Sequence, residues 1–398
     1  MQCPPAPVEQ KIYNNIVYTN LTNVLQFENE DQRTWWEEIA SIIGNMMERA
    51  AYDTHLQYFY LLLFHEYILS ALGPRPRSDG SARWKSFMTD DFTPIEVSWN
   101  FSANQSLVRF GIEPIGAFAG TPQDPFNDYR AIELIERMGH VAAAADYLDL
   151  QWFNHFANSF TVPNDRAQQI SEKLPKNEHV SQIFLALDFD DSKVSIKSYF
   201  FPILKSIETG ISPLDLMSRA LARLDTETIS VNAAWNVVED YMRSTALESQ
   251  PKAEIVASDC VNPLQSRIKV YFRTSHTAFD KVRDVYTLGG RLADESTRKA
   301  VGILKELWWL VLGLSDDVLE TDELAHRDQD QADHRTAGAI FNFEIKPGAK
   351  LPEPKVYIPV RHYARSDLDI AQGLTTFFER CEWSSLAQSY MTDLKDIL

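Results

Sequence analysis

The chain has 398 residues, a length that suits either two or three average domains or one large barrel. Lysine and arginine number 38 against 56 aspartates and glutamates, giving a net charge of −18, so sequence-independent binding to nucleic-acid phosphates is disfavoured. Hydrophobic residues make up 44%, which provides a full core and excludes wholesale disorder.

The cysteines and the N-terminal segment bear on the cellular compartment. Cys3, Cys260 and Cys381 lie far apart and show no spacing typical of a zinc site or a disulfide framework. A reduced, cytoplasmic compartment is therefore expected. The N-terminus lacks the apolar stretch of a signal peptide, and the longest apolar run, Tyr58–Phe64, is too short to cross a bilayer. We expect neither a membrane partner nor a nucleic-acid partner.

The predicted elements alternate between pairs of strands and pairs of helices. Residues 1–24 indicate a flexible, proline-containing lead-in, and a single domain is expected over 25–398. Strands are predicted at 94–102, 106–114, 182–190, 193–202, 253–260, 266–273, 339–348 and 354–360. Helices are predicted from about residue 29 to 51 and at 55–72, 128–158, 203–224, 230–246, 276–314 and 367–395, with a surface loop at 316–336. The helical region 276–314 is expected to be interrupted near Gly289–Gly290.

This order predicts the fold class. A strand–strand–helix–helix unit recurs about four times, at a spacing of roughly 70–90 residues. Antiparallel hairpins that each carry two helices predict an α+β fold, with a closed antiparallel β-barrel inside a ring of helices. A parallel (β/α)8 barrel fits less well, because it requires one helix after each strand and continuously hydrophobic strands.

The second strand of each predicted hairpin carries lysine or arginine where a buried strand would carry aliphatic residues. Side chains at i and i+2 share one face of a strand, so on three of these strands a cation shares its face with a tyrosine. The cations are Arg109, Lys197, Arg267, Lys269 and Lys355, and the tyrosines are Tyr199, Tyr271 and Tyr357.

The chemistry of this set indicates an anionic substrate. If the sheet closes, five cations meet in its interior, where they cannot neutralise one another and require an anion. Diphosphate is a suitable anion, because lysine and arginine bind phosphate oxygens by charge-assisted hydrogen bonds. Tyrosine faces stabilise a cation by several tenths to about 2 kcal/mol each, which suits ionisation of an allylic diphosphate. The alternative is a solvated strand face without function.

Acidic residues give weaker signals. Glu96 lies inside a predicted strand, either on a wet face or as the group that binds and deprotonates an acceptor N–H. Asp316–Glu320 resembles the metal-binding motif of prenyl-diphosphate synthases, and Asp188, Asp190 and Asp191 form a second cluster. The first lies in the expected loop and the second at a hairpin turn, so we expect no metal and no other cofactor.

Ten segments together resemble the fungal aromatic prenyltransferases of the dimethylallyltryptophan synthase family. The resemblance extends from about residue 26 to residue 390 and implies the antiparallel barrel known as the ABBA fold. It implies metal-independent transfer of a dimethylallyl group from its diphosphate to an aromatic ring, usually an indole, in secondary metabolism. The resemblance thus implies two small-molecule partners, the allylic diphosphate and the aromatic acceptor. A homodimer is the oligomeric state that we consider for the chain. The segments include TPIEVSWN, VRFGIEP, LALDFD, IKSYFFPILK, SRIKVYF, YTLGGR and LPEPKVYIPV.

The resemblance also implies residue roles. Glu96 matches the glutamate that holds the indole N–H, and the three tyrosines match those that shield the allylic cation. The five cations match the diphosphate-binding set, although Lys355 occupies a position where the tryptophan C4-prenylating enzymes have glutamine.

Three residues that differ from the family pattern lie in the expected acceptor pocket. Met88 is assigned to the same pocket. Phe184 replaces a lysine proposed as the rearomatising base, Glu254 replaces an arginine that reads an amino-acid carboxylate, and Phe201 replaces a shield tyrosine. The loss of that arginine favours a cyclic dipeptide or another indole alkaloid over free tryptophan. The chain is also expected to lack the family's final strands. A phenol or polyketide acceptor, or a catalytically impaired barrel that acts as a binding protein, is the alternative.

Overall fold

The computed structural model describes residues 15–397 except 78, 103–105, 142–146, 175–178, 191–192, 329 and 331–333. Eight antiparallel strands form one sheet in which each strand pairs with the next along the chain. The eight predicted strands are confirmed, with ends shifted by a few residues. They are β1 (Ile95–Phe101), β2 (Ser106–Ile112), β3 (Ile183–Asp190), β4 (Lys193–Phe200), β5 (Lys252–Asp259), β6 (Ile268–Thr274), β7 (Ala339–Ile345) and β8 (Glu353–Tyr357).

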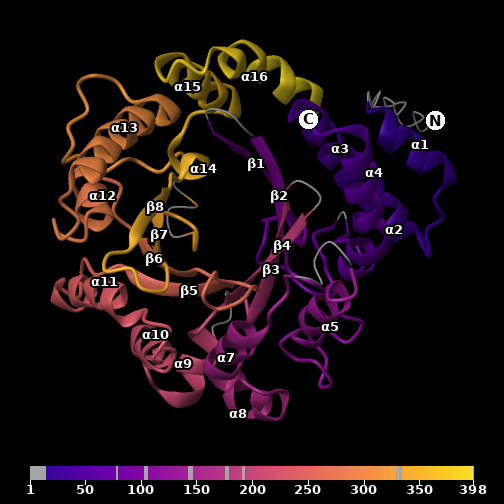
Figure 1. Cartoon of the computed structure of the whole chain (residues 1–398), viewed down its shortest axis with the longest axis horizontal. Coiled ribbons are helices and arrows are strands. Elements are labelled where there is room, and N and C mark those ends of the chain that lie inside the picture. Colours follow the sequence, from indigo (N-terminus) through magenta and orange to yellow (C-terminus); the bar gives the residue numbers. More distant parts are fainter. Residues whose placement is uncertain are drawn as a thin grey trace.

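The sheet is curled but open. Figure 1 shows its strands on an arc inside the helices. Within the described residues no pairing joins β8 to β1, so the expected closure of the barrel is not found. Both edge strands keep one unpaired side, and the sheet is a half-barrel with an inner face.

Helices surround the outer face of the sheet (Figure 1). In the region 128–158, expected to be helical, the described residues form α5 and the beginning of α7. The region 276–314 is interrupted at Gly289 and Gly290, as expected, where the φ angles are +64° and +81°. The helices are α1 (Ile16–Val24), α2 (Glu30–Trp35), α3 (Ser41–Arg49), α4 (Thr54–Leu63), α5 (Tyr129–Met138), α7 (Gln151–Phe160), α8 (Ala167–Ile170), α9 (Ile203–Thr209), α10 (Pro213–Ala222), α11 (Asn232–Ser244), α12 (Phe279–Tyr286), α13 (Glu295–Leu312), α14 (Val360–Tyr363), α15 (Asp367–Arg380) and α16 (Ser384–Ile397).

Helix α1 corrects the expected lead-in over 1–24. The Asn15 side chain caps the helix by accepting a hydrogen bond from the backbone N–H of Tyr18. Tyr18 is buried and stacks on Trp36 with ring centroids 5.7 Å apart. An N-cap and an apolar face therefore fix this segment as a helix, while residues 1–14 lie outside the described part of the chain.

The outer face of the sheet forms the core with the helices. Phe110, Phe200, Val270 and Phe343 are each fully buried there. Alternation along the strands then places the cations and tyrosines on the opposite, inner face. Burial of the aliphatic face thus determines where the polar face points.

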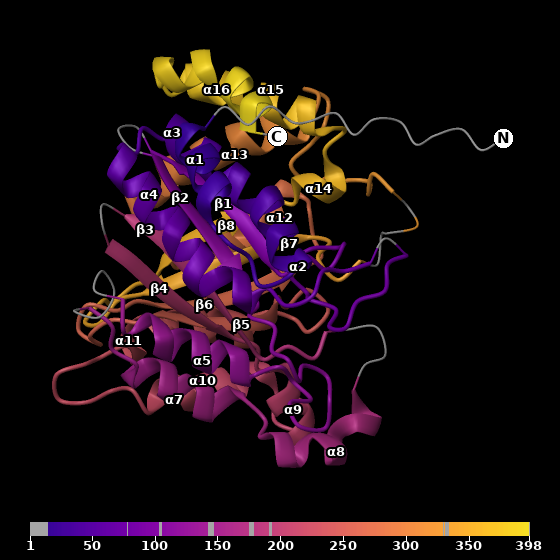
Figure 2. The same ribbon diagram turned by 90° about the vertical axis from the view of Figure 1, so that its right-hand side faces the viewer.

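Helices α15 and α16 complete the ring of helices between α13 and α3 (Figures 1 and 2). Arg380 of α15 contacts Glu306 of α13 at 2.6 Å, and Asp393 of α16 lies 3.4 Å from Arg49 of α3. Phe101 at the end of β1 packs edge-on against Phe378. None of the described helices is both long enough and apolar enough to span a membrane.

Candidate active site

The inner face of the sheet has two ends. At the hairpin end lie the short connections within each strand pair, from β1–β2 to β7–β8. At the crossover end, β1, β3, β5 and β7 begin and the helical connections join the sheet. The position of a residue along its strand therefore shows which end it occupies.

The five predicted cations lie in the middle of the inner face and toward its hairpin end. They are not alone, because the odd-numbered strands contribute three carboxylates between them. We call this set the charge ladder. It consists of Arg109, Asp188, Lys197, Asp259, Arg267, Lys269, Glu344 and Lys355.

Ion pairs connect most of the charge ladder. Arg267 donates from Nε to Asp259 at 2.6 Å, and its Nη1 lies 3.4 Å from Glu344. Lys197 pairs with Asp188, an acid expected at a hairpin turn. Carboxylates of the protein therefore supply part of the negative charge that the cations were expected to require.

The ladder nevertheless keeps two more cations than carboxylates. Arg109 lies opposite Asp188 in the strand register but forms no ion pair with the described residues. Lys355 contacts Glu344 at 3.3 Å while half of its side chain remains exposed. The excess positive charge and the accessible side chains leave the ladder able to bind an anion.

Two groups of the ladder have shifted pKa values. Burial lowers the pKa of Lys269 to about 8, although Asp259 opposes this effect. Burial also opposes ionisation of Glu344, but the nearby cations, Arg267 first, outweigh it and lower the pKa of that carboxyl. Glu344 is therefore a permanent anion at neutral pH, whereas Lys269 titrates close to neutrality.

If the ladder binds the diphosphate that the resemblance implies, its affinity for that anion should fall as the pH rises through about 8, because Lys269 then loses the proton that attracts it. Lys269→Arg should shift this decline to higher pH, since arginine stays charged up to a pH of about 12. The measurement is the Kd of dimethylallyl thiolodiphosphate by calorimetry between about pH 7 and pH 10. Identical pH profiles for the two proteins would contradict the assignment.

The three tyrosines form a row beside the ladder. Ring centroids lie 6.1 Å apart from Tyr199 to Tyr271 and again from Tyr271 to Tyr357. Burial raises the pKa of both Tyr199 and Tyr271, so these phenols stay neutral. A neutral π-face can attract a cation without supplying a nucleophilic phenolate.

Glu96 lies near the crossover end of β1, opposite Gly111. It makes no ion pair with the described residues, and desolvation by the surrounding protein raises its pKa. Its side chain stays exposed toward the interior. An accessible carboxylate of raised basicity suits the acceptance of a hydrogen bond or a proton.

The four residues predicted for the acceptor pocket all lie at the crossover end. Phe184 stacks on Tyr199 at 4.2 Å and lies 5.5 Å from Phe201. The Met88 methyl group lies 3.0 Å from where a Cβ on Gly111 would be, so glycine leaves it room beside Glu96. Glu254 forms an ion pair with Arg273 of β6, whose Nε lies 2.7 Å from Glu254 Oε1.

Two residues that the sequence analysis missed extend this pocket. The Phe87 ring lies 5.2 Å from Phe184 and 4.8 Å from His179. Burial lowers the pKa of His179 to about 3, so the ring is neutral. Both residues belong to loops, where no periodicity could have indicated them.

A buried carboxylate holds the loop that carries Phe87. Glu113 accepts hydrogen bonds from the Trp84 indole at 2.8 Å, the Ser86 hydroxyl at 2.6 Å and the Phe87 backbone N–H at 3.3 Å. It also accepts one from Ser181 at 2.5 Å. Four donors satisfy this otherwise costly buried group and fix the loop against the sheet.

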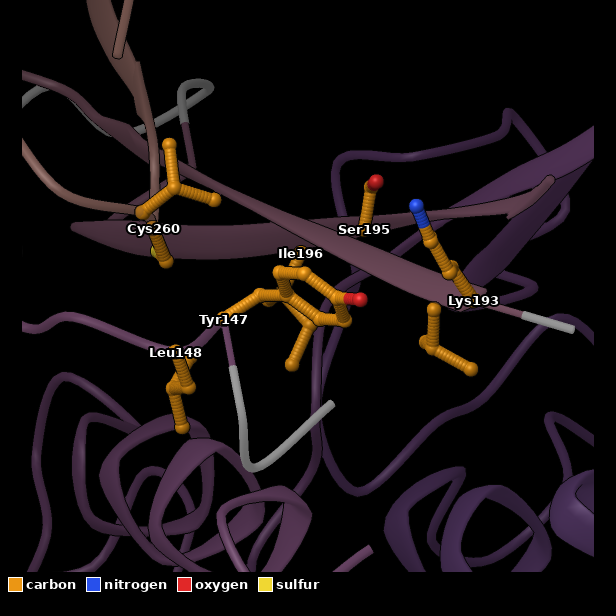
Figure 3. A pocket seen from close by; sticks show the side chains of 8 residues that line it. Tyr147, Leu148, Lys193, Ser195, Ile196 and Cys260 are labelled. Atoms are coloured by element: carbon orange, nitrogen blue, oxygen red, sulfur yellow. The ribbon is translucent and has the colours of Figure 1, made fainter. Parts of the chain in front are cut away.

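A small pocket elsewhere contains none of the predicted site residues. It lies beside the β3–β4 hairpin and against the segment before α7 (Figure 3). Tyr147 lines it, with the Lys193 ammonium 5.1 Å from its ring centroid, and Cys260 is buried beside it. The pocket is therefore separate from the charge ladder.

Comparisons with known proteins bear on this arrangement. The sequence profile of the family described as tryptophan dimethylallyltransferase matches residues 31–393. A 7-dimethylallyltryptophan synthase of Aspergillus fumigatus is 41% identical, covering 91% of this chain and 77% of the relative. A 4-O-dimethylallyl-L-tyrosine synthase of Claviceps purpurea is 37% identical, covering 87% of this chain and 76% of the relative.

Solved structures give the same fold. The crystal structure of AnaPT from Neosartorya fischeri aligns with a TM-score of 0.83 at 29% identity, covering 95% of this chain and 88% of that one. NotF in complex with brevianamide F and DMSPP aligns with a TM-score of 0.82 at 26% identity, covering 96% and 90%.

Proposed function

Because the chain belongs to the tryptophan dimethylallyltransferase family, and is therefore a prenyltransferase, we propose that it transfers a dimethylallyl group from its diphosphate to an indole acceptor. One observation carries this proposal: a cation-rich ladder, a row of neutral tyrosines and a glutamate without an ion-pair partner among the described residues share one inner face. Relatives named for tryptophan and for indole diterpenes, and a neighbour with bound brevianamide F, support an indole.

The ladder and the tyrosines divide the ionisation step between them. The allylic C1–O bond breaks, and its electron pair leaves with the diphosphate, whose growing negative charge the ladder cations stabilise. The faces of Tyr199 and Tyr271 stabilise the dimethylallyl cation left behind. Since the counter-charge comes from side chains, we infer that transfer proceeds without a metal.

Glu96 and the crossover end act on the acceptor. An indole carbon bonds to the allylic carbon, and the positive charge passes to the ring. Glu96, accepting a hydrogen bond from the ring N–H, stabilises that charge until the substituted carbon releases its proton to solvent. Phe184 cannot take up this proton, so the ring position that reacts must expose its C–H to water.

A phenol acceptor is the second candidate. The 37% identical relative is named for O-prenylation of tyrosine, so the two acceptor classes occur among proteins of comparable similarity. A phenol would form a C–O bond and would release its own O–H proton. Glu96 can accept a hydrogen bond from the N–H of an indole or from the O–H of a phenol, so its raised pKa does not separate the two acceptors.

The test is transfer from dimethylallyl diphosphate in EDTA to L-tryptophan, a tryptophan-containing cyclic dipeptide and L-tyrosine, with products identified by mass spectrometry and NMR. We expect a monoprenylated indole. Binding of the thiolodiphosphate without turnover on any acceptor would indicate a binding protein. Activity that is lost in EDTA and restored by magnesium would contradict the metal-independent step.

A further inference from the structure

Side chains connect the two edge strands, β8 and β1, at the crossover end of the sheet. There β8 ends and leads into α14, and the loop of Phe87 and Met88 leads into β1. Arg361 of α14 forms an ion pair with Asp90 of that loop, and His334 Nε2 lies 3.5 Å from the same carboxylate. These contacts therefore link two strands that do not pair with each other within the described residues.

The segment around Thr336 connects this junction to the acceptor pocket. Arg335 Nη2 donates a hydrogen bond to the Phe87 carbonyl at 2.5 Å. Arg273, on the inner face of the sheet, donates from Nη1 to the Thr336 carbonyl at 3.0 Å. The Thr336 hydroxyl lies 2.7 Å from Nε2 of His362, a buried residue of α14. His362 thus contacts the segment that in turn contacts the wall of the pocket.

Three histidines and Thr336 form a directed series of hydrogen bonds, which we call the histidine chain. The backbone N–H of Asp328 donates to His326 Nδ1 at 3.1 Å, and that of Thr336 donates to His334 Nδ1 at 3.3 Å. A ring nitrogen that accepts has no proton, so each of these neutral rings has its proton on Nε2. His326 Nε2 then donates to His362 Nδ1 at 3.0 Å, which leaves His362 Nε2 to donate to the Thr336 hydroxyl. That hydroxyl donates to His334 Nδ1 at 2.9 Å.

We propose that His362 is a positioning residue that, through Thr336 and the histidine chain, holds the Phe87 loop against the acceptor pocket. The chain requires a neutral His362, because a proton on Nδ1 would face the N–H of His326 and leave two donors without an acceptor. The effect on acceptor use rests on the proposed prenyl transfer, whereas the effect on the loop does not.

The surroundings of His362 favour the neutral ring. Burial lowers its pKa to about 4. Nearby basic groups act in the same direction, and they are His326, His334, Arg361 and Arg273. The acid of this cluster, Asp90, is already paired with Arg361. Since an unfolded histidine has a pKa of about 6.5, the histidine chain stabilises the fold above that pH and ceases to do so as the pH falls to about 4.

The first experiment measures backbone hydrogen–deuterium exchange of residues 84–90 at neutral pH. His362→Phe keeps a ring but loses both hydrogen bonds, and Thr336→Val removes the hydroxyl at similar size, so each should speed exchange there about fivefold or more. His362→Gln keeps a donor for Thr336 and should restore slow exchange. His155→Phe, on α7, is the matched control, because it loses a hydrogen bond to the Ala220 carbonyl far along the chain and should leave 84–90 unchanged.

Kinetics and stability test the consequences. With a tryptophan-containing cyclic dipeptide, His362→Phe should raise the acceptor KM about 5–30-fold and leave kcat and the Kd of dimethylallyl thiolodiphosphate within about twofold. As the pH falls from about 7 to about 4.5, the unfolding constant of the wild type should rise about 10–100-fold more than that of His362→Gln.

Unchanged exchange at 84–90 in both His362→Phe and Thr336→Val would overturn the proposal, as would an equal increase in His155→Phe. Faster exchange without a change in the acceptor KM would also overturn it, because the loop would then not position the acceptor. Parallel pH profiles of stability would exclude the requirement for a neutral ring. No turnover on any indole, together with the expected exchange results, would overturn only the proposed function.

Discussion

Glu96→Gln is expected to lower kcat with an indole acceptor by about 10²–10³-fold, the range for loss of a group placed to stabilise charge that develops in the transition state. Glutamine keeps the size of the side chain but cannot accept a proton or stabilise a positive ring by charge. Glu96 has no ion-pair partner in the described part of the chain, so the substitution leaves no orphaned cation. The measurement is steady-state kinetics with saturating dimethylallyl diphosphate.

A matched acceptor separates this role from a structural one. N1-methyltryptophan has no ring N–H, so Glu96 cannot accept a hydrogen bond from it and acts on it only through its charge. The ratio of wild-type to variant rates should therefore be smaller than with an N–H indole. Glu136→Gln, at an exposed position of α5 without an ion pair among the described residues, controls for the loss of one negative charge. Full activity of Glu96→Gln with an N–H indole would exclude the assigned role.

The sequence could predict the cation face because that face depends on local alternation. Lys269 and Tyr271 share a side of β6 whatever strands lie beside it. The counter-ions depend on register, since Asp259 meets Arg267 only because β5 and β6 pair as they do. No single-strand pattern contains that pairing, which is why the sequence analysis did not identify the carboxylates of the ladder.

The acceptor end was harder to predict, for two physical reasons. Bulges disturb the alternation on which the face of a side chain is predicted, and Glu254 lies at one. Phe87 is placed by a loop that Glu113 anchors through hydrogen bonds, a tertiary effect without periodicity. Closure of the sheet depends on the twist summed over eight strands, and the local sequence does not determine that sum.

Arg267→Gln is expected to raise the Kd of dimethylallyl thiolodiphosphate by about 30–150-fold, or about 2–3 kcal/mol, the worth of one or two charge-assisted hydrogen bonds. The Arg267 side chain is 34% exposed toward the interior, so its loss should not unfold the sheet. The Kd of Arg267→Lys should lie between those of the wild type and Arg267→Gln, because lysine keeps the positive charge but lacks the guanidinium fork. Calorimetry provides the measurement.

Arg273→Gln provides the decisive contrast, because Arg267 comes just before β6, Arg273 lies near the end of β6, and both side chains are on its inner face. Each substitution removes one positive charge, but only Arg267 lies at the hairpin end beside Asp259 and Glu344. If the ladder binds the diphosphate, only Arg267→Gln weakens donor binding. Equal weakening would mean that the donor responds to the total charge of the interior rather than to the ladder. The separation of donor and acceptor ends would then be wrong.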